Sequence, residues 1–77
     1  MSLYGFSVGD KVALNFNIEI NGAVITKEDI GEIVDQQRDT FGREMNYFFV
    51  AWDQYIDEEG ATVASWFYSS EMRKVTQ

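Results

Sequence analysis

Residues 44–53 read EMNYFFVAWD and hold four of the twelve aromatic side chains of this 77-residue chain. Aromatic and β-branched residues are typical of β-strands, because they pack well on a pleated surface. In a strand, alternate side chains face opposite sides, which gives two apolar sets: Phe48, Val50 and Trp52 on one face, and Tyr47, Phe49 and Ala51 on the other. One face can fill a core, and the other needs a terminus, a loop or a partner to cover it. We therefore interpret residues 44–53 as the central strand of a small β-barrel.

The composition fits a single small domain, 1–77, without covalent or metal cross-links. The chain has no Cys, which excludes disulfides and thiolate metal sites, and no His, which removes the commonest general base and zinc ligand. Domains of this size usually need such cross-links. We expect burial of the six Phe, four Tyr and two Trp side chains to replace them.

The charge balance is strongly acidic, with six basic against thirteen acidic residues and a net charge of −7. A nucleic-acid partner is not expected, because binding to phosphates needs clustered Lys and Arg, and Arg73-Lys74 is the only adjacent basic pair. The sequence has no apolar run that approaches a membrane span, and Met1-Ser2-Leu3 lacks the start of a signal peptide. We expect a cytoplasmic protein with no membrane contact.

Apolar side chains occupy every second position from Val12 to Ile20, and the positions between them are polar apart from Ala13, which predicts one half-buried strand over residues 11–20. The pair Asn21-Gly22 that follows is the strongest short signal for a β-hairpin, with residues 23–26 as the return arm. Upstream, Phe6 and Val8 alternate in the same way and suggest a short edge strand.

Residues 26–41 fit two structures. Thr26 and Asp29 have the spacing of a capping box, and several apolar residues after them fall near helical spacing. Gly31 opposes a helix, since glycine inside one costs about 1 kcal/mol relative to alanine. The alternative is a strand over 30–37 and a turn at 39–42. We favour the strand.

The remaining residues predict a loop over 54–60, a strand over 61–68, a single helical turn over 69–72 capped by a serine, and a short last strand over 73–76. The expected core comprises seven apolar residues: Val12, Leu14, Phe16, Ile33, Val50, Trp52 and Val75.

Five short motifs now stand in order: GDKV at 9–12, GEIV at 31–34, FVAWD at 49–53, Trp66 with Tyr68, and SEMRKV at 70–75. Over residues 9–76 the chain resembles the small SH3-like barrels, a broad group that includes KOW-type domains, the mind-bomb type domain and a small barrel protein of photosystem I. The resemblance implies an all-β, five-stranded SH3-like barrel with one short helical turn before the last strand. It implies no function by itself, because this fold hosts many. KOW-type domains that bind RNA are typically basic, and this acidic chain departs from them.

Twelve rings exceed what the interior of one small barrel holds, so some must lie at the surface or under a loop. Five of them are candidates for a binding groove: Tyr47, Phe49, Tyr55, Trp66 and Tyr68. In SH3-like barrels, aromatic residues on such a surface take proline-rich peptides, methylated side chains or a partner subunit. The alternative is a second small core covered by residues 1–8 or by the first loop.

Other candidate sites are weaker. The acidic loop 53–60 offers hard oxygen ligands for Ca²⁺ or Mg²⁺, but Tyr55 stands where an EF-hand needs its third-position ligand, and a solvated hairpin tip is the simpler interpretation. Arg38 and Arg43 could clamp an anion, although a solvated turn is the simpler interpretation here too. Ser65, Ser69 and Ser70 have no His to activate them. We expect neither an enzyme nor a bound cofactor or metal.

The sequence therefore predicts a non-enzymatic interaction or assembly module that docks through surface aromatic residues onto a protein partner or onto itself. Two alternatives stay open: a nucleic-acid-associated, KOW-like accessory domain, and a weak divalent-cation-binding protein that uses the loop 53–60.

Overall fold

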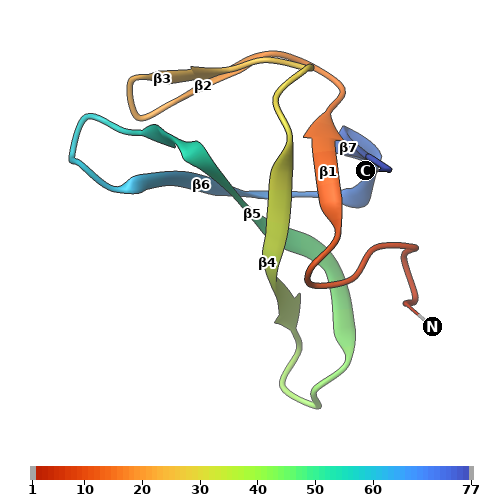
Figure 1. Cartoon of the computed structure of the whole chain (residues 1–77). Coiled ribbons are helices and arrows are strands. Elements are labelled where there is room, and N and C mark those ends of the chain that lie inside the picture. The colour runs from red at the N-terminus through yellow and green to blue at the C-terminus, as the bar shows by residue number, and fades with distance from the viewer. Residues whose placement is uncertain (1, 77) are drawn as a thin grey trace.

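The structure, a computed structural model, describes residues 2–76 and consists of strands and one 3₁₀ turn. The strands are β1 (Lys11–Leu14), β2 (Ile18–Ile20), β3 (Ala23–Ile25), β4 (Gly31–Arg38), β5 (Glu44–Ile56), β6 (Thr62–Phe67) and β7 (Met72–Lys74), with the 3₁₀ turn η1 (Ser69–Glu71) before β7 (Figure 1). The predicted all-β class is confirmed. The strand interpretation of residues 26–41 is also confirmed, since β4 occupies their centre.

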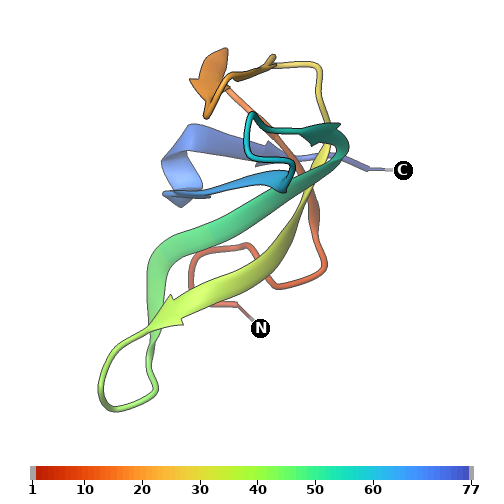
Figure 2. The same cartoon turned by 90° about the vertical axis from the view of Figure 1, so that its left-hand side faces the viewer.

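Five strands form one antiparallel sheet in the order β6-β5-β4-β1-β7, and β2 and β3 form a separate two-stranded sheet. The thirteen-residue β5 lies between β4 and β6 and pairs with both. The predicted closed barrel does not form, because β6 and β7 are the two ends of the sheet's strand order and do not pair with each other. The chain passes from one end to the other through η1. Figure 2 shows the sheet strongly twisted, with the β4–β5 hairpin projecting away from the β2–β3 hairpin.

The single strand predicted over residues 11–20 is in fact two strands, because the chain bends after Leu14. Two hydrogen bonds fix the bend: the Asn15 N–H donates to the Glu71 carbonyl at 2.9 Å, and Arg73 Nη1 donates to the Leu14 carbonyl at 2.7 Å. The apolar alternation continues across the bend, so Phe16 and Ile18 remain half-buried against the core.

The predicted hairpin at Asn21-Gly22 is confirmed. Asn21 has φ 48° and Gly22 has φ 89°, and two positive φ angles are what a two-residue type I′ hairpin loop requires. The tip is held against the loop between β5 and β6. The Glu58 N–H donates to the Asn21 carbonyl at 3.1 Å, and Asn21 Nδ2 donates to Glu59 Oε1 at 2.7 Å.

The turn predicted at 39–42 is confirmed, and Asp39 organises it by accepting hydrogen bonds from the N–H groups of Phe41 and Arg43. The loop predicted over 54–60 is shorter than expected, because β5 continues to Ile56. The edge strand predicted around Phe6 and Val8 does not form.

The one-turn helix is present as η1, but its N-cap is Tyr68 and not a serine. The Glu71 carboxylate accepts the Tyr68 N–H at 2.8 Å and so satisfies the first free amide of the turn. Because η1 ends at Glu71, β7 begins one residue earlier than predicted, at Met72.

All five strands of the large sheet contribute buried residues to the core, and β3 of the small sheet contributes Ile25. Of the seven predicted core residues, five are fully buried and two, Phe16 and Val75, are only half-buried. Phe16 lies on the bend between β1 and β2, and Val75 lies past the end of β7. The core cluster also contains five apolar residues that the prediction omitted: Ile25, Phe48, Val63, Phe67 and Met72.

Candidate aromatic surface

The register between β5 and β6 separates their aromatic side chains into two layers. Phe48 is opposite Phe67, and Phe49 is opposite Trp66. Since neighbouring residues of a strand face opposite sides, one pair fills the core and the other lies on the outer face. Phe48 and Phe67 are accordingly buried, whereas Phe49 and Trp66 are only half-buried.

Four of the five predicted site residues come together on this outer face, and we call them the aromatic patch: Tyr47, Phe49, Trp66 and Tyr68. The Tyr47 and Trp66 rings stack with centroids 5.1 Å apart at an angle of 14°. Phe49 lies 5.0 Å from Trp66, and Tyr68 lies 5.2 Å from Tyr47. Such pairs are each worth about 0.5–1.5 kcal/mol beyond their buried area. The rings therefore support one another as a fixed platform.

The aromatic patch is partly open to solvent. Tyr68 is 54% exposed, and the other three rings are half-buried. Met45, which precedes Tyr47 by two residues on β5, is 42% exposed and was not among the predicted site residues. The register between β4 and β5 shifts between the pairs Gln36–Phe48 and Arg38–Glu44, so alternation alone does not place Met45 on the face of the patch.

The fifth predicted residue, Tyr55, is not part of the aromatic patch. Tyr55 was predicted to lie in the loop 54–60, but it belongs to β5, beyond the point at which the register between β5 and β6 shifts. Its ring packs against the core, and its hydroxyl donates to Asp29 Oδ1 at 2.8 Å.

Asp29 also accepts the Thr26 N–H at 2.8 Å and the Thr26 hydroxyl at 3.1 Å. Only half of the predicted capping box is therefore present, because the Asp29 N–H donates to the Thr26 carbonyl and not to its hydroxyl. These bonds close a turn before β4 and start no helix. Partial burial raises the pKa of Asp29, and the hydrogen bonds from Thr26 and Tyr55 outweigh it, so the pKa lies below its usual value of 3.8. The hydrogen bond to Asp29 raises the pKa of Tyr55 above 10.0, with further contributions from desolvation and the Asp29 charge.

The N-terminal arm was one possible cover for the surface rings, but its contacts lie elsewhere. The Phe6 ring lies 5.9 Å from Phe48, which belongs to the core layer, and Ser7 and Val8 line a hollow beside β4. No ring contact of the aromatic patch within residues 2–76 involves this arm.

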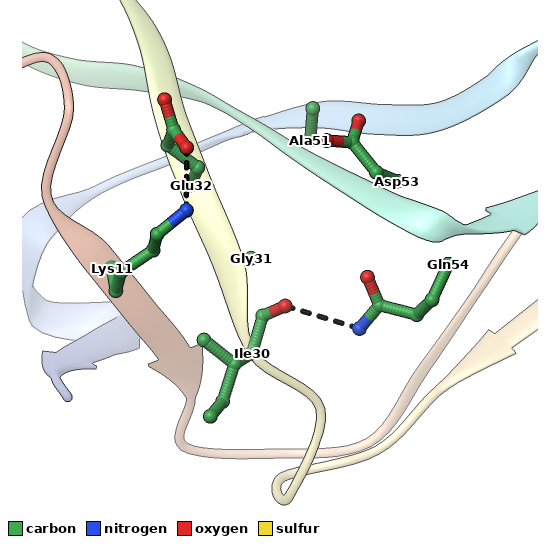
Figure 3. Close-up of a pocket in the computed structure, with 7 residues that line it drawn as sticks. All are labelled: Lys11, Ile30, Gly31, Glu32, Ala51, Asp53 and Gln54. Atoms are coloured by element: carbon green, nitrogen blue, oxygen red, sulfur yellow. Dashed lines mark hydrogen bonds and ion pairs between the residues drawn. The ribbon is translucent and has the colours of Figure 1, made fainter. Parts of the chain in front are cut away.

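A shallow depression of about 190 Å³ lies along β4 and β5 on the side of Ala51 (Figure 3). Its lining is mainly polar: Lys11 and Glu32 form an ion pair at 2.6 Å, and Gln54 Nε2 donates to the Ile30 carbonyl at 3.0 Å. Sites for small ligands are usually apolar and measure about 300–1,000 Å³. The depression does not resemble such a site.

The acidic loop forms a hairpin tip. Asp57 Oδ1 accepts the N–H groups of Glu59 at 2.9 Å and Ala61 at 3.0 Å. The hydrogen bond from the Ala61 amide is the largest influence on the pKa of Asp57 and lowers it. Nowhere in residues 2–76 do three or more acidic side chains gather as ligands for a metal.

Arg38 and Arg43 both interact with their own turn. Arg43 Nε lies 2.7 Å from Asp39 Oδ2, and its guanidinium lies 5.2 Å from the centre of the Phe41 ring. Arg38 Nη1 donates to the Gly42 carbonyl at 2.7 Å. These contacts favour the solvated-turn interpretation over an anion clamp.

Comparison with known proteins gave no match among family models, curated proteins or solved structures. Residues 2–76 also contain no helix with the length and apolar character needed to cross a membrane.

Proposed function

We propose that this chain is a non-enzymatic interaction module whose aromatic patch binds a basic segment of another protein. The observation that carries the proposal is the patch itself, in which four mutually packed rings lie on one outer sheet face and remain partly exposed. Tyr and Trp suit protein interfaces because they offer a large contact area with few rotors and a polar tip.

The charge distribution favours a basic partner. Residues 44–72, which form β5, β6 and η1 and reach the start of β7, contain six acidic residues and no Lys or Arg. On β4, Asp35 is paired directly opposite Phe49. A guanidinium or ammonium group can rest on the face of a Trp or Tyr ring and gain from the acidic surroundings. A second copy of the chain would instead bring like charges together, so we favour a different protein over self-association.

The finer description of the fold is part of the same proposal. The strand order β6-β5-β4-β1-β7, with a single 3₁₀ turn between β6 and β7, supports an SH3-like arrangement. In that arrangement the aromatic patch occupies the outer face of β5 and β6 and the start of the turn that follows β6.

Two matched substitutions test the proposal. Tyr68→Ala removes an exposed ring from the patch, and Phe41→Ala removes a ring that is 82% exposed at the tip of the β4–β5 hairpin. The immobilised chain and both variants are used to capture proteins from a cell extract, and captured proteins are retested as purified proteins over a salt series. We expect Tyr68→Ala to lose at least about tenfold in affinity and Phe41→Ala to bind like the unaltered chain.

Weaker binding at higher salt would support the predicted charge complementarity. Equal affinity of the Tyr68→Ala variant and the unaltered chain would contradict the patch as the docking surface. Light scattering that shows a stable dimer, lost in the Tyr68→Ala variant, would replace the basic partner with a second copy.

A further inference from the structure

Strand β6 is one edge of the five-stranded sheet, and no strand pairs with its outer side within residues 2–76. An edge strand presents alternate backbone N–H and C=O groups to whatever lies beside it. The hydrogen bonds of the other strands determine which residues of β6 present these groups outward.

The direction of the backbone N–H and C=O groups of β6 can be deduced from Ile33 on β4, by following the strand pairing from β4 through β5 to β6. The Ile33 N–H donates to the Asp10 carbonyl at 3.0 Å and the Ile33 carbonyl accepts the Gly9 N–H at 2.7 Å, so Ile33 faces the β1 side. Glu32 must then face β5, and its partner Ala51 must face β4.

Because the direction alternates along a strand, Val50 and Trp52 face β6, where they are paired with Ser65 and Val63. The residues between and beyond these partners, Ala64 and Trp66, therefore direct their N–H and C=O groups away from the sheet.

The outward groups of Ala64 and Trp66 form no hydrogen bond in the part of the chain that the structure describes. Other free amides near sheet edges are satisfied locally. The Tyr68 N–H donates to Glu71 Oε1, and the Gln36 N–H on β4 donates to Asp35 Oδ1, each at 2.8 Å.

Residues 63–67 of β6 read VASWF and contain no charge and no proline, the usual devices that protect an edge from pairing. The opposite edge, β7, carries Arg73 and Lys74. The β6 edge, which has neither charge nor proline, also carries Trp66 of the aromatic patch, and β2 lies close to β6.

We infer that the basic partner segment binds as an extended strand added antiparallel to β6, with basic side chains opposite Ala64 and Trp66. This inference rests on the proposed docking function and specifies how the partner binds. In an antiparallel hydrogen-bonded pair the two side chains lie on the same face. The partner's side chain opposite Trp66 therefore lies beside the Trp66 and Tyr68 rings, and the one opposite Ala64 lies beside a small residue that leaves it room.

A peptide of alternating arginine and valine, about ten residues long with blocked ends, is the probe. In the inferred register the backbone N–H and C=O groups of its arginines hydrogen-bond to those of Ala64 and Trp66. The backbone groups of its valines point away from β6. One N-methylated version blocks the arginine amides, and a matched version blocks the valine amides. A peptide of alternating glutamate and valine is the charge control. Binding is measured at physiological salt, with amide exchange of Ala64 and Trp66 followed by NMR.

We expect the arginine–valine peptide to bind and to slow exchange of both amides. N-methylation of the arginine amides should weaken binding by at least about tenfold, and N-methylation of the valine amides should not, because only the former donate to β6. On the protein, Ala64→Pro removes an outward N–H without breaking the pairing with β5. It should weaken binding to a similar extent, with its thermal midpoint reported alongside.

If both N-methylated peptides bind as well as the parent while Tyr68→Ala abolishes binding, the patch docks basic segments but strand addition is wrong. If the glutamate peptide binds as well as the arginine peptide, or the arginine peptide does not bind, both the proposed basic partner and strand addition are overturned.

Discussion

The hydroxyl of Tyr55 donates a 2.8 Å hydrogen bond to Oδ1 of Asp29 and so joins the end of β5 to the turn between β3 and β4. Tyr55→Phe removes this hydrogen bond and keeps the ring. We expect the variant to have a lower thermal midpoint than the unaltered chain at neutral pH. Tyr4→Phe, which alters an exposed tyrosine of the N-terminal arm, is the control and should leave the midpoint unchanged.

The pH dependence of this difference follows from two pKa shifts. The pKa of Asp29 is lowered in the folded state, so its contribution is present above the ordinary aspartate value of 3.8 and is lost as the pH falls through the folded value. The pKa of Tyr55 is raised, so its contribution is present below 10.0 and is lost as the pH rises through the folded value. The difference in midpoint should be largest between these limits. A difference that stays constant from strong acid to neutral pH would contradict the assigned hydrogen bond.

Tyr55 also shows what sequence alone could and could not predict. The alternation of residues 47–52 and the Asn21-Gly22 turn are local patterns, and both predict the structure correctly. The register shift after Trp52 and the bend after Leu14 depend on contacts with residues distant in sequence. The bend, for example, needs the Glu71 carbonyl and the Arg73 guanidinium. No local pattern identifies such partners, so the fold class and the four residues of the aromatic patch were predictable, but the placement of Tyr55 was not.

Gly31 lies directly against the indole of Trp52. A Cβ atom at Gly31 would lie 2.8 Å from Trp52 Nε1 and 2.9 Å from the Ala51 carbonyl oxygen, both closer than ordinary contact. Gly31→Ala should therefore destabilise the chain by about 1–3 kcal/mol in urea unfolding, as overpacking usually does.

A double-mutant cycle with Trp52→Phe identifies the cause. The smaller ring removes Nε1, which is buried without a hydrogen-bond partner within residues 2–76, and gives the new methyl group room. Trp52→Phe alone should be destabilising, because it leaves a cavity. In that background, Gly31→Ala should cost less than it does in the unaltered chain, by at least about 0.5 kcal/mol. Strict additivity would show that the clash is with the Ala51 backbone alone.

The two tryptophans differ in solvent access, and fluorescence quenching should separate them. Trp52 is fully buried, whereas Trp66 is half-buried on the outer face. Acrylamide should quench the fluorescence of a Trp52→Phe variant efficiently and that of a Trp66→Phe variant weakly. If Trp66 were instead protected as well as Trp52, a cover over the aromatic patch would be indicated, and the docking proposal would lose its basis.

The Asp57 carboxylate has a structural role in the loop between β5 and β6, and this role can be separated from metal binding. Its Oδ1 accepts two backbone N–H groups, those of Glu59 and Ala61. Asn keeps an acceptor oxygen at this position and Ala does not. We therefore expect Asp57→Asn to melt close to the unaltered chain and Asp57→Ala to melt at a lower temperature.

If the Asp57 carboxylate were instead a metal ligand, Ca²⁺ would stabilise the chain. A Ca²⁺ site gains affinity from each carboxylate charge, and Asp57→Asn removes one. The described residues bring no three acidic side chains together. Millimolar Ca²⁺ should therefore leave the melting temperatures of the unaltered chain and of Asp57→Asn equally unchanged. If Ca²⁺ raised the midpoint of the unaltered chain and Asp57→Asn abolished the rise, the carboxylate would be a metal ligand, and the loop would be a cation site in addition to a hairpin tip.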